Sequence, residues 1–349
     1  MQYRKLGDSE LLVSELCLGT MNYGKQNTLE DAKNQLSYAF DRGINFIDTA
    51  EMYPAPTCSE TQGKTEEYIG KWLVTQPRDR VIIGTKIAGP SGGQTLPITW
   101  IREGKNRIDR KNIQEAVEGS LKRLQTDYID LYQIHWPDRY VPLFGGSDYD
   151  PNYERETVAI AEQLEAFGEL VKAGKIRYLG VSNETPWGVC EFCHLARQLG
   201  LPKIVSIQNA FNLTNRVFQI HLAEACRFHN VGLMAYSTLA FGHLTGKYLS
   251  QIPAGSRVDL FPKFDKRYQK PHFQEAVKAY VDLAHKNGLT PVQLALGFVR
   301  SRWFVTSTII AASTIEQLQE NISCVDVVLS PEILTEIDRI HARYPNPVP

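Results

Sequence analysis

Residues 129–135 have the sequence Ile-Asp-Leu-Tyr-Gln-Ile-His, a short apolar run that ends in a polar side chain. Runs of this kind, rich in β-branched residues, occur eight times in the 349-residue chain, and stretches with apolar residues at helical spacing separate them. Strands that alternate with helices form a parallel sheet, and eight such units predict an α/β fold of the closed (β/α)₈ TIM-barrel kind. The eight runs are Leu16–Thr20, Ile44–Asp48, Val81–Lys86, Ile129–His135, Tyr178–Asn183, Ile204–Asn209, Gly232–Ser237 and Phe304–Ile310.

Two further patterns complete the predicted barrel. No G-x-G-x-x-G follows a predicted strand, which argues against an open dinucleotide-binding sheet. Tyr3–Val13, with a turn at Asp8-Ser9, predicts a β-hairpin within residues 1–14 that closes the bottom of the barrel. We expect one domain, residues 1–349, with long connections after three strand ends, where barrel enzymes build their sites. These connections are residues 88–109, 138–157 and 237–270, and helical patterns include Leu29–Arg42, Asn112–Leu124, Ala159–Lys172, Pro186–Leu199 and Phe218–Phe228.

Charge and composition favour small-molecule partners. The formal net charge of -1 offers no general attraction for nucleic acid or for an acidic membrane. The N-terminus lacks the apolar stretch of a signal peptide, and no run approaches the roughly 18 apolar residues that span a bilayer. We therefore expect a cytoplasmic protein with reduced cysteines, and a monomer as the default state.

Four side chains near the predicted strand ends suit the reduction of a carbonyl group. These are Asp48, Lys86 and His135, together with Tyr53, five residues beyond Asp48. Carbonyl reduction needs a hydride donor and an acid that protonates the developing alkoxide, and a tyrosine with an ordinary pKa near 10 is a reluctant acid. The Lys86 ammonium is expected to lower that pKa, with Asp48 holding the lysine, while a neutral His135 orients the carbonyl oxygen.

Each of the four residues also has an ordinary structural role when it is taken alone. Asp48 suits a helix cap, Lys86 a solvated strand end, Tyr53 a loop aromatic and His135 a core histidine. Their joint placement at successive strand ends favours a site at the top of the barrel. A metal-dependent hydrolase or an aldolase is a weaker alternative, because no cluster of His and Asp accompanies these ends, and we expect no metal.

The motifs around these residues resemble those of the aldo-keto reductase superfamily along essentially the whole chain. Residues 48–53, Asp-Thr-Ala-Glu-Met-Tyr, Lys86 after an apolar strand, and residues 133–138, Gln-Ile-His-Trp-Pro-Asp, carry the resemblance. The Tyr53-Pro54 step and the Ala55–Gly63 segment are most similar to the bacterial Tas-type branch. The resemblance implies NADP(H)-dependent reduction of an aldehyde or ketone to an alcohol, with Tyr53 as general acid, Lys86 and Asp48 as its tuners and His135 as the substrate orienter.

The same resemblance implies a set of residues that bind NADP(H). Ser313 and Thr314 open a predicted helix whose N-terminus suits a 2′-phosphate. Ala311 stands where glycine is usual and Ser313 where many relatives carry arginine, so the strength of the preference for NADP over NAD stays open. Pro54 replaces the glycine that usually follows the acid, which is expected to reshape the substrate rim without affecting the proton relay. The implied cofactor-binding residues are Gly19, Thr20, Met21, Asp48, Ser182, Asn183, Gln208, Tyr236, Ser237, Leu239, Gly242, Leu244, Gly246, Lys247, Ala311, Ser313, Gln317, Glu320 and Asn321.

Three alternatives remain at this stage. Some members of this superfamily act as potassium-channel β-subunits that bind NADP with little turnover, although the predicted hairpin from residue 3 leaves no N-terminal inactivation tail. Cys190 and Cys193, followed by His194, match a haem or half-zinc motif, but their predicted helix favours one buried helix face. The aromatic residues of the fourth loop either line a substrate pocket or anchor the loop; they are Tyr140, Phe144, Tyr149 and Tyr153.

Overall fold

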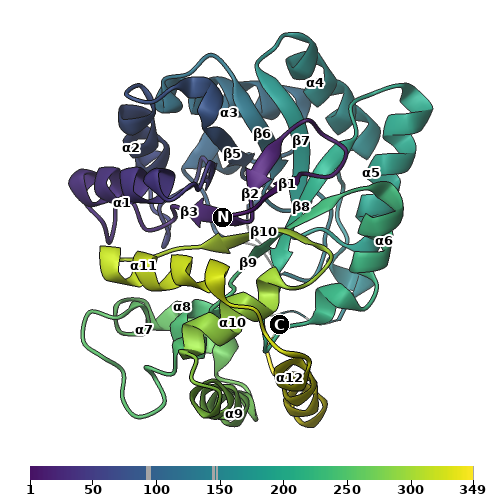
Figure 1. Ribbon diagram of the computed structural model, residues 1–349. Coiled ribbons are helices and arrows are strands. Elements are labelled where there is room, and N and C mark those ends of the chain that lie inside the picture. Colours follow the sequence, from purple (N-terminus) through teal and green to yellow (C-terminus); the bar gives the residue numbers. More distant parts are fainter. Residues whose placement is uncertain (92–95, 144–145, 147, 349) are drawn as a thin grey trace.

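Eight parallel strands form a closed barrel at the centre of the molecule (Figure 1). The computed structural model describes residues 1–91, 96–143, 146 and 148–348. Each strand begins within two residues of a predicted run, so the TIM-barrel prediction is confirmed. In barrel order the strands are β10 (Val305–Ile310), β3 (Leu16–Gly19), β4 (Phe46–Asp48), β5 (Ile82–Ile87), β6 (Ile129–Ile134), β7 (Ile176–Ser182), β8 (Ile204–Ala210) and β9 (Gly232–Tyr236).

The predicted hairpin is present and closes the bottom of the barrel. Its strands β1 (Tyr3–Lys5) and β2 (Leu12–Ser14) pair antiparallel. Leu6, Leu11 and Val13 are fully or almost fully buried, and they pack in one cluster with residues of the barrel strands such as Phe46 and Leu131. The hairpin therefore excludes water from the end of the barrel opposite the strands' carboxyl ends.

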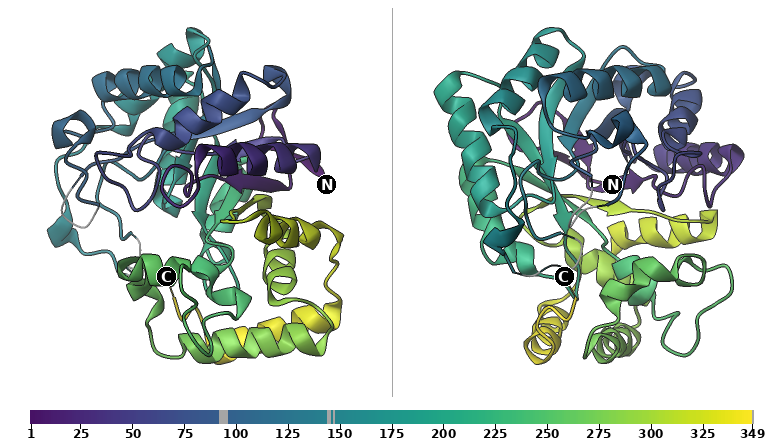
Figure 2. Two further views of the ribbon diagram at one scale, coloured as in Figure 1. Left: turned by 90° about the vertical axis from the view of Figure 1, so that its left-hand side faces the viewer. Right: turned by 180° about the vertical axis from the view of Figure 1, so that it is seen from behind.

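Helices surround the barrel and bury its outer face. The largest apolar cluster joins strand residues such as Ile83 and Leu179 to helix residues such as Ile113 and Phe167. The helices are α1 (Leu29–Asp41), α2 (Lys64–Leu73), α3 (Arg110–Leu124), α4 (Ile160–Lys172), α5 (Pro186–Leu199), α6 (Leu222–His229), α7 (Arg257–Leu260), α8 (Pro262–Asp265), α9 (Phe273–Lys286), α10 (Pro291–Arg300), α11 (Ile315–Ser323) and α12 (Pro331–Arg343). Figure 1 shows α9, α10 and α12 at the bottom of the view, where α9 packs against both of the others, whereas α11 lies higher and contacts α1. Figure 2 shows the same arrangement from two further sides.

The helix ends follow local sequence signals. Thr185 caps α5 by accepting from the backbone N–H of Gly188, and Pro186 occupies the first turn, so the predicted bounds of this helix are confirmed. The expectation that both of its cysteines face the core is wrong, because Cys193 is buried whereas Cys190 is exposed. Three positions correspond to about 300° of helical rotation, so the two side chains point roughly 60° apart and Cys190 lies outside the buried face.

Three long connections follow the carboxyl ends of strands β5, β6 and β9. Residues 88–109 hold the short 3₁₀ helix η2 (Ile101–Gly104), residues 138–157 hold η3 (Pro151–Tyr153), and residues 237–270 hold η5 (Ala240–Thr245), α7, α8 and η6 (Lys266–Tyr268). Residues 92–95 of the first connection and residues 144, 145 and 147 of the second, including Phe144, lie outside the described residues.

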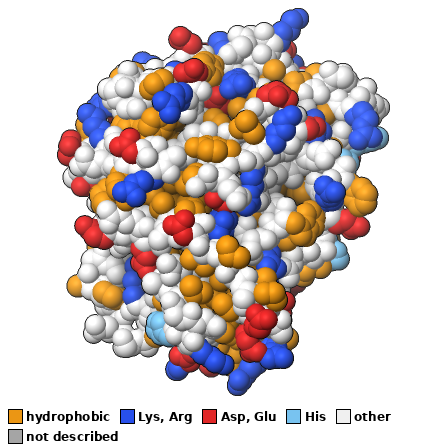
Figure 3. Space-filling model, viewed as in Figure 1, with side chains coloured by type: hydrophobic (Ala, Val, Ile, Leu, Met, Phe, Trp, Pro, Cys, Tyr) orange, Lys and Arg blue, Asp and Glu red, His pale blue; other side chains and the backbone are white. Residues whose placement is uncertain are grey.

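The described surface gives no sign of a membrane-spanning segment. None of the helices within the described ranges is both long and apolar enough to cross a bilayer. Lys, Arg, Asp and Glu side chains are intermixed over the face shown in Figure 3. This mixture agrees with the balanced composition of the chain.

Candidate active site

Strand register brings Asp48 and Lys86 together at the top of the barrel. Asp48, the last residue of β4, pairs with Gly84 of β5, and Lys86 lies two residues further along β5. The Lys86 Nζ lies 2.8 Å from Asp48 Oδ2 and also donates to the Thr49 carbonyl oxygen at 2.7 Å.

The Asp48–Lys86 ion pair is buried, and its hydrogen bonds are satisfied. The two side chains are 4% and 0% exposed, and Asp48 Oδ1 accepts from Gln208 at 2.8 Å and from Gln133 at 3.4 Å. Burial lowers the pKa of Lys86, but the charge of Asp48 and its hydrogen bond outweigh burial, so this pKa lies above its ordinary value. Lys86 is therefore an ammonium at neutral pH.

Tyr53 lies beside this ammonium at the edge of the barrel mouth. Lys86 Nζ is 5.0 Å from the centre of the Tyr53 ring. Burial raises the pKa of Tyr53 and Lys86 lowers it, and the net direction is upward from 10.0. Lys86 lowers the pKa of Tyr53 as expected, but burial of the phenol raises this pKa by more, so the net shift differs from what the lysine alone would give.

His135 faces Tyr53 across the same opening. The two rings meet edge to face, with centroids 5.6 Å apart and an interplanar angle of 80°. Burial, helped by the charge of Lys86, holds the pKa of His135 well below 6.5, so the imidazole is neutral at physiological pH, as expected. Its buried Nδ1 has no hydrogen-bond partner in the described part of the chain.

A cavity of about 970 Å³ opens above Asp48, Tyr53 and His135 and continues toward α11. Lys86 lies beneath its floor rather than in its lining, because its side chain is fully buried. Leu244 and Gly246 do not line the cavity either: Leu244 is buried, and Gly246 ends η5 with a positive φ of 81°. The remaining predicted cofactor residues line it, namely Gly19, Thr20, Met21, Asp48, Ser182, Asn183, Gln208, Tyr236, Ser237, Leu239, Gly242, Lys247, Ala311, Ser313, Gln317, Glu320 and Asn321.

The polar residues after β7 and β8 form a hydrogen-bonded wall of the cavity. Ser182 Oγ donates to the Gln208 carbonyl oxygen at 2.8 Å, and Asn183 Nδ2 donates to the His135 carbonyl oxygen at 2.8 Å. The Tyr236 hydroxyl donates to Asn183 Oδ1 at 2.5 Å. These bonds fix the orientation of Ser182, Asn183 and Tyr236, three of the predicted cofactor-binding residues.

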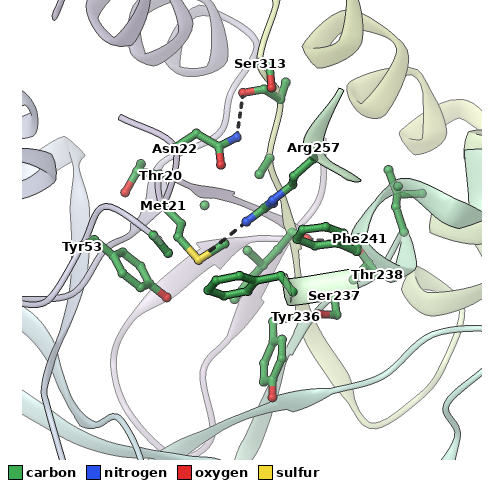
Figure 4. Close-up of a pocket in the computed structure, with 18 of the residues that line it drawn as sticks. Thr20, Met21, Asn22, Tyr53, Tyr236, Ser237, Thr238, Phe241, Arg257 and Ser313 are labelled. Carbon is green, nitrogen blue, oxygen red and sulfur yellow. Dashed lines mark hydrogen bonds between the residues drawn. The ribbon is translucent and has the colours of Figure 1, made fainter. Parts of the chain in front are cut away.

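Five cations of the described residues line the cavity, and only Lys247 among them is predicted from the sequence. Arg257 projects into the cavity, with Nη2 at 3.9 Å from Met21 Sδ and the guanidinium carbon 4.6 Å from the centre of the Phe241 ring (Figure 4). Burial lowers the pKa of Arg257 to about 10, which leaves it charged at neutral pH. Within the described ranges, no carboxylate forms an ion pair with any of the five cations that line the cavity, which are Lys247, Arg257, Lys263, Lys266 and Arg267.

The tyrosines of the fourth loop contact one another rather than the cavity. The Tyr140 ring lies 5.3 Å from that of Tyr149 and 5.4 Å from that of Tyr153, measured between centroids. None of these three residues lines the cavity. Of the two interpretations left open by the sequence, the structure favours an anchored loop.

The fold and this site place the chain in a known class of oxidoreductases. The sequence matches the model of the Aldo/keto reductase family over residues 15–342, so the chain belongs to that family, whose members generally use NAD(P)H. It is 49% identical to Protein tas of Escherichia coli (strain K12), with 100% of each chain covered. The predicted similarity to the Tas-type branch is confirmed.

Two further relatives show how far the family extends. The chain is 33% identical to Uncharacterized oxidoreductase YrpG of Bacillus subtilis (strain 168), with 99% of this chain and 97% of that protein covered. It is also 33% identical to Putative voltage-gated potassium channel subunit beta of Schizosaccharomyces pombe, with 97% of this chain and 92% of that protein covered. One relative is thus named as an oxidoreductase and the other as a channel subunit.

Proposed function

We propose that this protein reduces an aldehyde or ketone to an alcohol with NADPH, with Tyr53 as the general acid. The observation that carries the proposal is the position of Tyr53: it lines the large cavity, faces neutral His135 and lies 5.0 Å from the ammonium of Lys86. At the same degree of burial, a phenol beside a fixed positive charge loses its proton to an alkoxide more readily than one without that charge. The raised pKa keeps that proton in place until the alkoxide develops.

The residues of the site have separate roles in this reaction. Bound NADPH supplies the hydride. Tyr53 donates its hydroxyl proton to the carbonyl oxygen, and the Lys86 ammonium stabilises the tyrosinate that remains. Asp48 holds Lys86 in place through the 2.8 Å ion pair, and His135 orients the carbonyl oxygen as a neutral hydrogen-bond donor. A buried site with these fixed charges needs little reorganisation as the negative charge develops.

The charge of the cavity suits a phosphorylated dinucleotide. Its five lining cations have no carboxylate partners among the described residues, and the buried Nε of Arg257 has no hydrogen-bond partner there. Phosphate oxygens accept bidentate hydrogen bonds from a guanidinium, so Arg257 and Arg267 suit an anion. An additional phosphate on the ribose favours NADP over NAD at such a site, which supports NADPH as the cofactor.

Cofactor oxidation tests the proposal directly. Purified protein is titrated with NADPH and with NADH while tryptophan fluorescence is followed, and a panel of aldehydes and ketones is then added while absorbance of the reduced cofactor is recorded. We expect tighter binding of NADPH and turnover of at least one carbonyl. Absence of binding to either nucleotide would contradict the proposal.

A nucleotide-binding regulatory subunit is a second candidate, and the similarity to the potassium channel subunit of Schizosaccharomyces pombe favours it. Such a protein would have the same four residues but little turnover. Tight NADPH binding without reduction of any carbonyl in the panel, together with a stable protein complex, would support this candidate over the reductase.

A further inference from the structure

The segment formed by residues 96–104 belongs to the same apolar cluster as Tyr53. Its buried residues Ile98 and Ile101 belong to an apolar cluster that also contains Tyr53 and Trp136, and Leu96 from the same segment lines the cavity. This cluster is separate from the two clusters that stabilise the barrel. The packing of the tyrosine on this side therefore depends on where residues 96–104 lie.

The end of this segment has a backbone conformation that its residues do not favour. Arg102, Glu103 and Gly104 have φ values of 48°, 56° and 75° in succession. Only the last is glycine, and the left-handed region is unfavourable for the other two. Consecutive left-handed residues persist only where surrounding contacts fix them.

A buried ion pair supplies such a contact. Arg102 Nη1 donates to Glu51 Oε2 at 2.8 Å and Nη2 donates to Oε1 at 2.7 Å, and the two side chains are 6% and 3% exposed. Glu51 Oε1 also accepts from the backbone N–H of Ala88 at 2.6 Å, and the Glu51 N–H donates to the Lys86 carbonyl oxygen at 3.1 Å. Glu51 thus connects the segment of Asp48 and Tyr53 to the end of the Lys86 strand, and Arg102 joins residues 96–104 to both.

We propose that Arg102 is a positioning residue which, through Glu51, holds residues 96–104 against Tyr53 and so fixes both the acid and the substrate-side wall of the cavity. The inference rests on the proposed function, in which Tyr53 is the acid. Arg102 itself does not line the cavity, so it acts through the residues that it holds. Leu96 belongs to the segment that Arg102 holds, and it lines the cavity. The reduction of bulky carbonyls therefore depends on Arg102 more than the reduction of small ones does.

The test compares Arg102→Met and Arg102→Lys with Arg78→Met as a matched control. Arg78 also forms a 2.8 Å ion pair with a buried carboxylate, that of Asp130, but the pair lies at the opposite end of the barrel and neither residue lines the cavity. For R102M we expect kcat/KM to fall about tenfold to a hundredfold, because small displacements of reacting groups have effects of this size. In R102M the KM of the bulkiest carbonyl should rise most, whereas NADPH affinity should change less than about twofold. R102K should recover part of the lost kcat/KM. R78M should keep wild-type kinetics.

Hydrogen exchange gives a readout that does not require turnover. In R102M, amides of residues 50–53 and 96–104 should exchange faster than in wild type, and in R78M they should not. Equal kinetics of R102M and R78M, or unchanged exchange in these segments, would overturn the inference. If wild type binds NADPH but reduces no carbonyl, the proposed function fails, and exchange alone decides the role of Arg102. If R102M does not fold, R102K replaces it as the test variant. The inference is then overturned if R102K shows the same kinetics and the same hydrogen exchange as wild type.

Discussion

The two ends of the barrel both bury carboxylates, but they differ in how cations and carboxylates are matched. At the bottom, Asp130 accepts from Arg78, Arg177 and the Ile83 N–H, and Glu15 pairs with two further arginines, Arg4 and Arg300. At the top, Asp48 is matched in the same way by Lys86, yet five cations along the adjoining cavity have no carboxylate within the described ranges.

The difference distinguishes charged side chains that stabilise the fold from charged side chains that can bind a ligand. A cation beside a buried carboxylate is already neutralised, and its loss affects stability. A cation without such a partner in a concave, partly apolar site is neutralised only when an anion binds. An arginine that is paired with a carboxylate at the bottom is therefore expected to give a stability phenotype, whereas an unpaired arginine of the cavity is expected to give a binding phenotype. Four substitutions or conditions test this contrast.

The largest expected effect belongs to Tyr53→Phe. Removal of the hydroxyl removes the proposed proton donor while the ring and its contact with His135 remain. Positioned acids contribute roughly 10²–10⁴-fold to rate, so kcat should fall by about that factor. NADPH affinity and the thermal midpoint should stay close to wild type. Steady-state kinetics, a fluorescence titration and a thermal melt measure these three quantities. A Y53F protein with full activity would remove Tyr53 from the mechanism.

Arg257→Met should weaken cofactor binding next most strongly. Hydrogen bonds to charged groups contribute about 1.5–3 kcal/mol, so the Kd of NADPH should rise roughly 10–100-fold, with a smaller rise for NADH. Arg339→Met, which removes an arginine of an exposed pair on α12, is the control and should leave both affinities unchanged. Equal losses for the two nucleotides would place Arg257 away from the phosphate that distinguishes them.

The pH dependence of kcat tests the protonation states of the site. Tyr53 must carry its proton to act as an acid, and its pKa lies above 10.0, so activity should be lost only as pH rises through that higher value. His135 must be neutral, and its pKa lies well below 6.5, so it should not limit the rate near neutrality. We expect a flat profile from about pH 7 to 9 when chemistry limits turnover. A fall in kcat within that interval would contradict these assignments.

Arg78→Met should have the smallest effect on activity. Asp130 keeps Arg177 and the Ile83 N–H as partners, so the loss of Arg78 should lower the free energy of unfolding by about 1–3 kcal/mol without changing kcat/KM. Denaturant titration and kinetics on one preparation measure the two quantities. A changed kcat/KM at full folding would show that the bottom of the barrel also influences the site, and the contrast between the ends would fail.

Much of the fold and of the catalytic group follows from local pattern. Alternation of apolar runs and helical stretches predicts the strands, and strand ends in a parallel barrel must meet at one rim, which brings Asp48, Lys86 and His135 together. The start of α5 at Pro186 follows from the Thr185 cap and the proline, and its end at Leu199 follows from Gly200, which has a left-handed conformation. These features depend on neighbours along the chain, so spacing alone is sufficient to predict them.

Contacts between distant loops could not be predicted in this way. Arg257 and Met21 are 236 residues apart, and Arg102 and Glu51 are 51 residues apart, so no periodic pattern links either pair. The net pKa of Tyr53 is a further case: its neighbour Lys86 is visible in the sequence, but the burial that outweighs it arises only when residues 96–104 and Trp136 pack on the ring. Strand order and residue chemistry are local properties, whereas burial and loop contacts depend on the path of the whole chain.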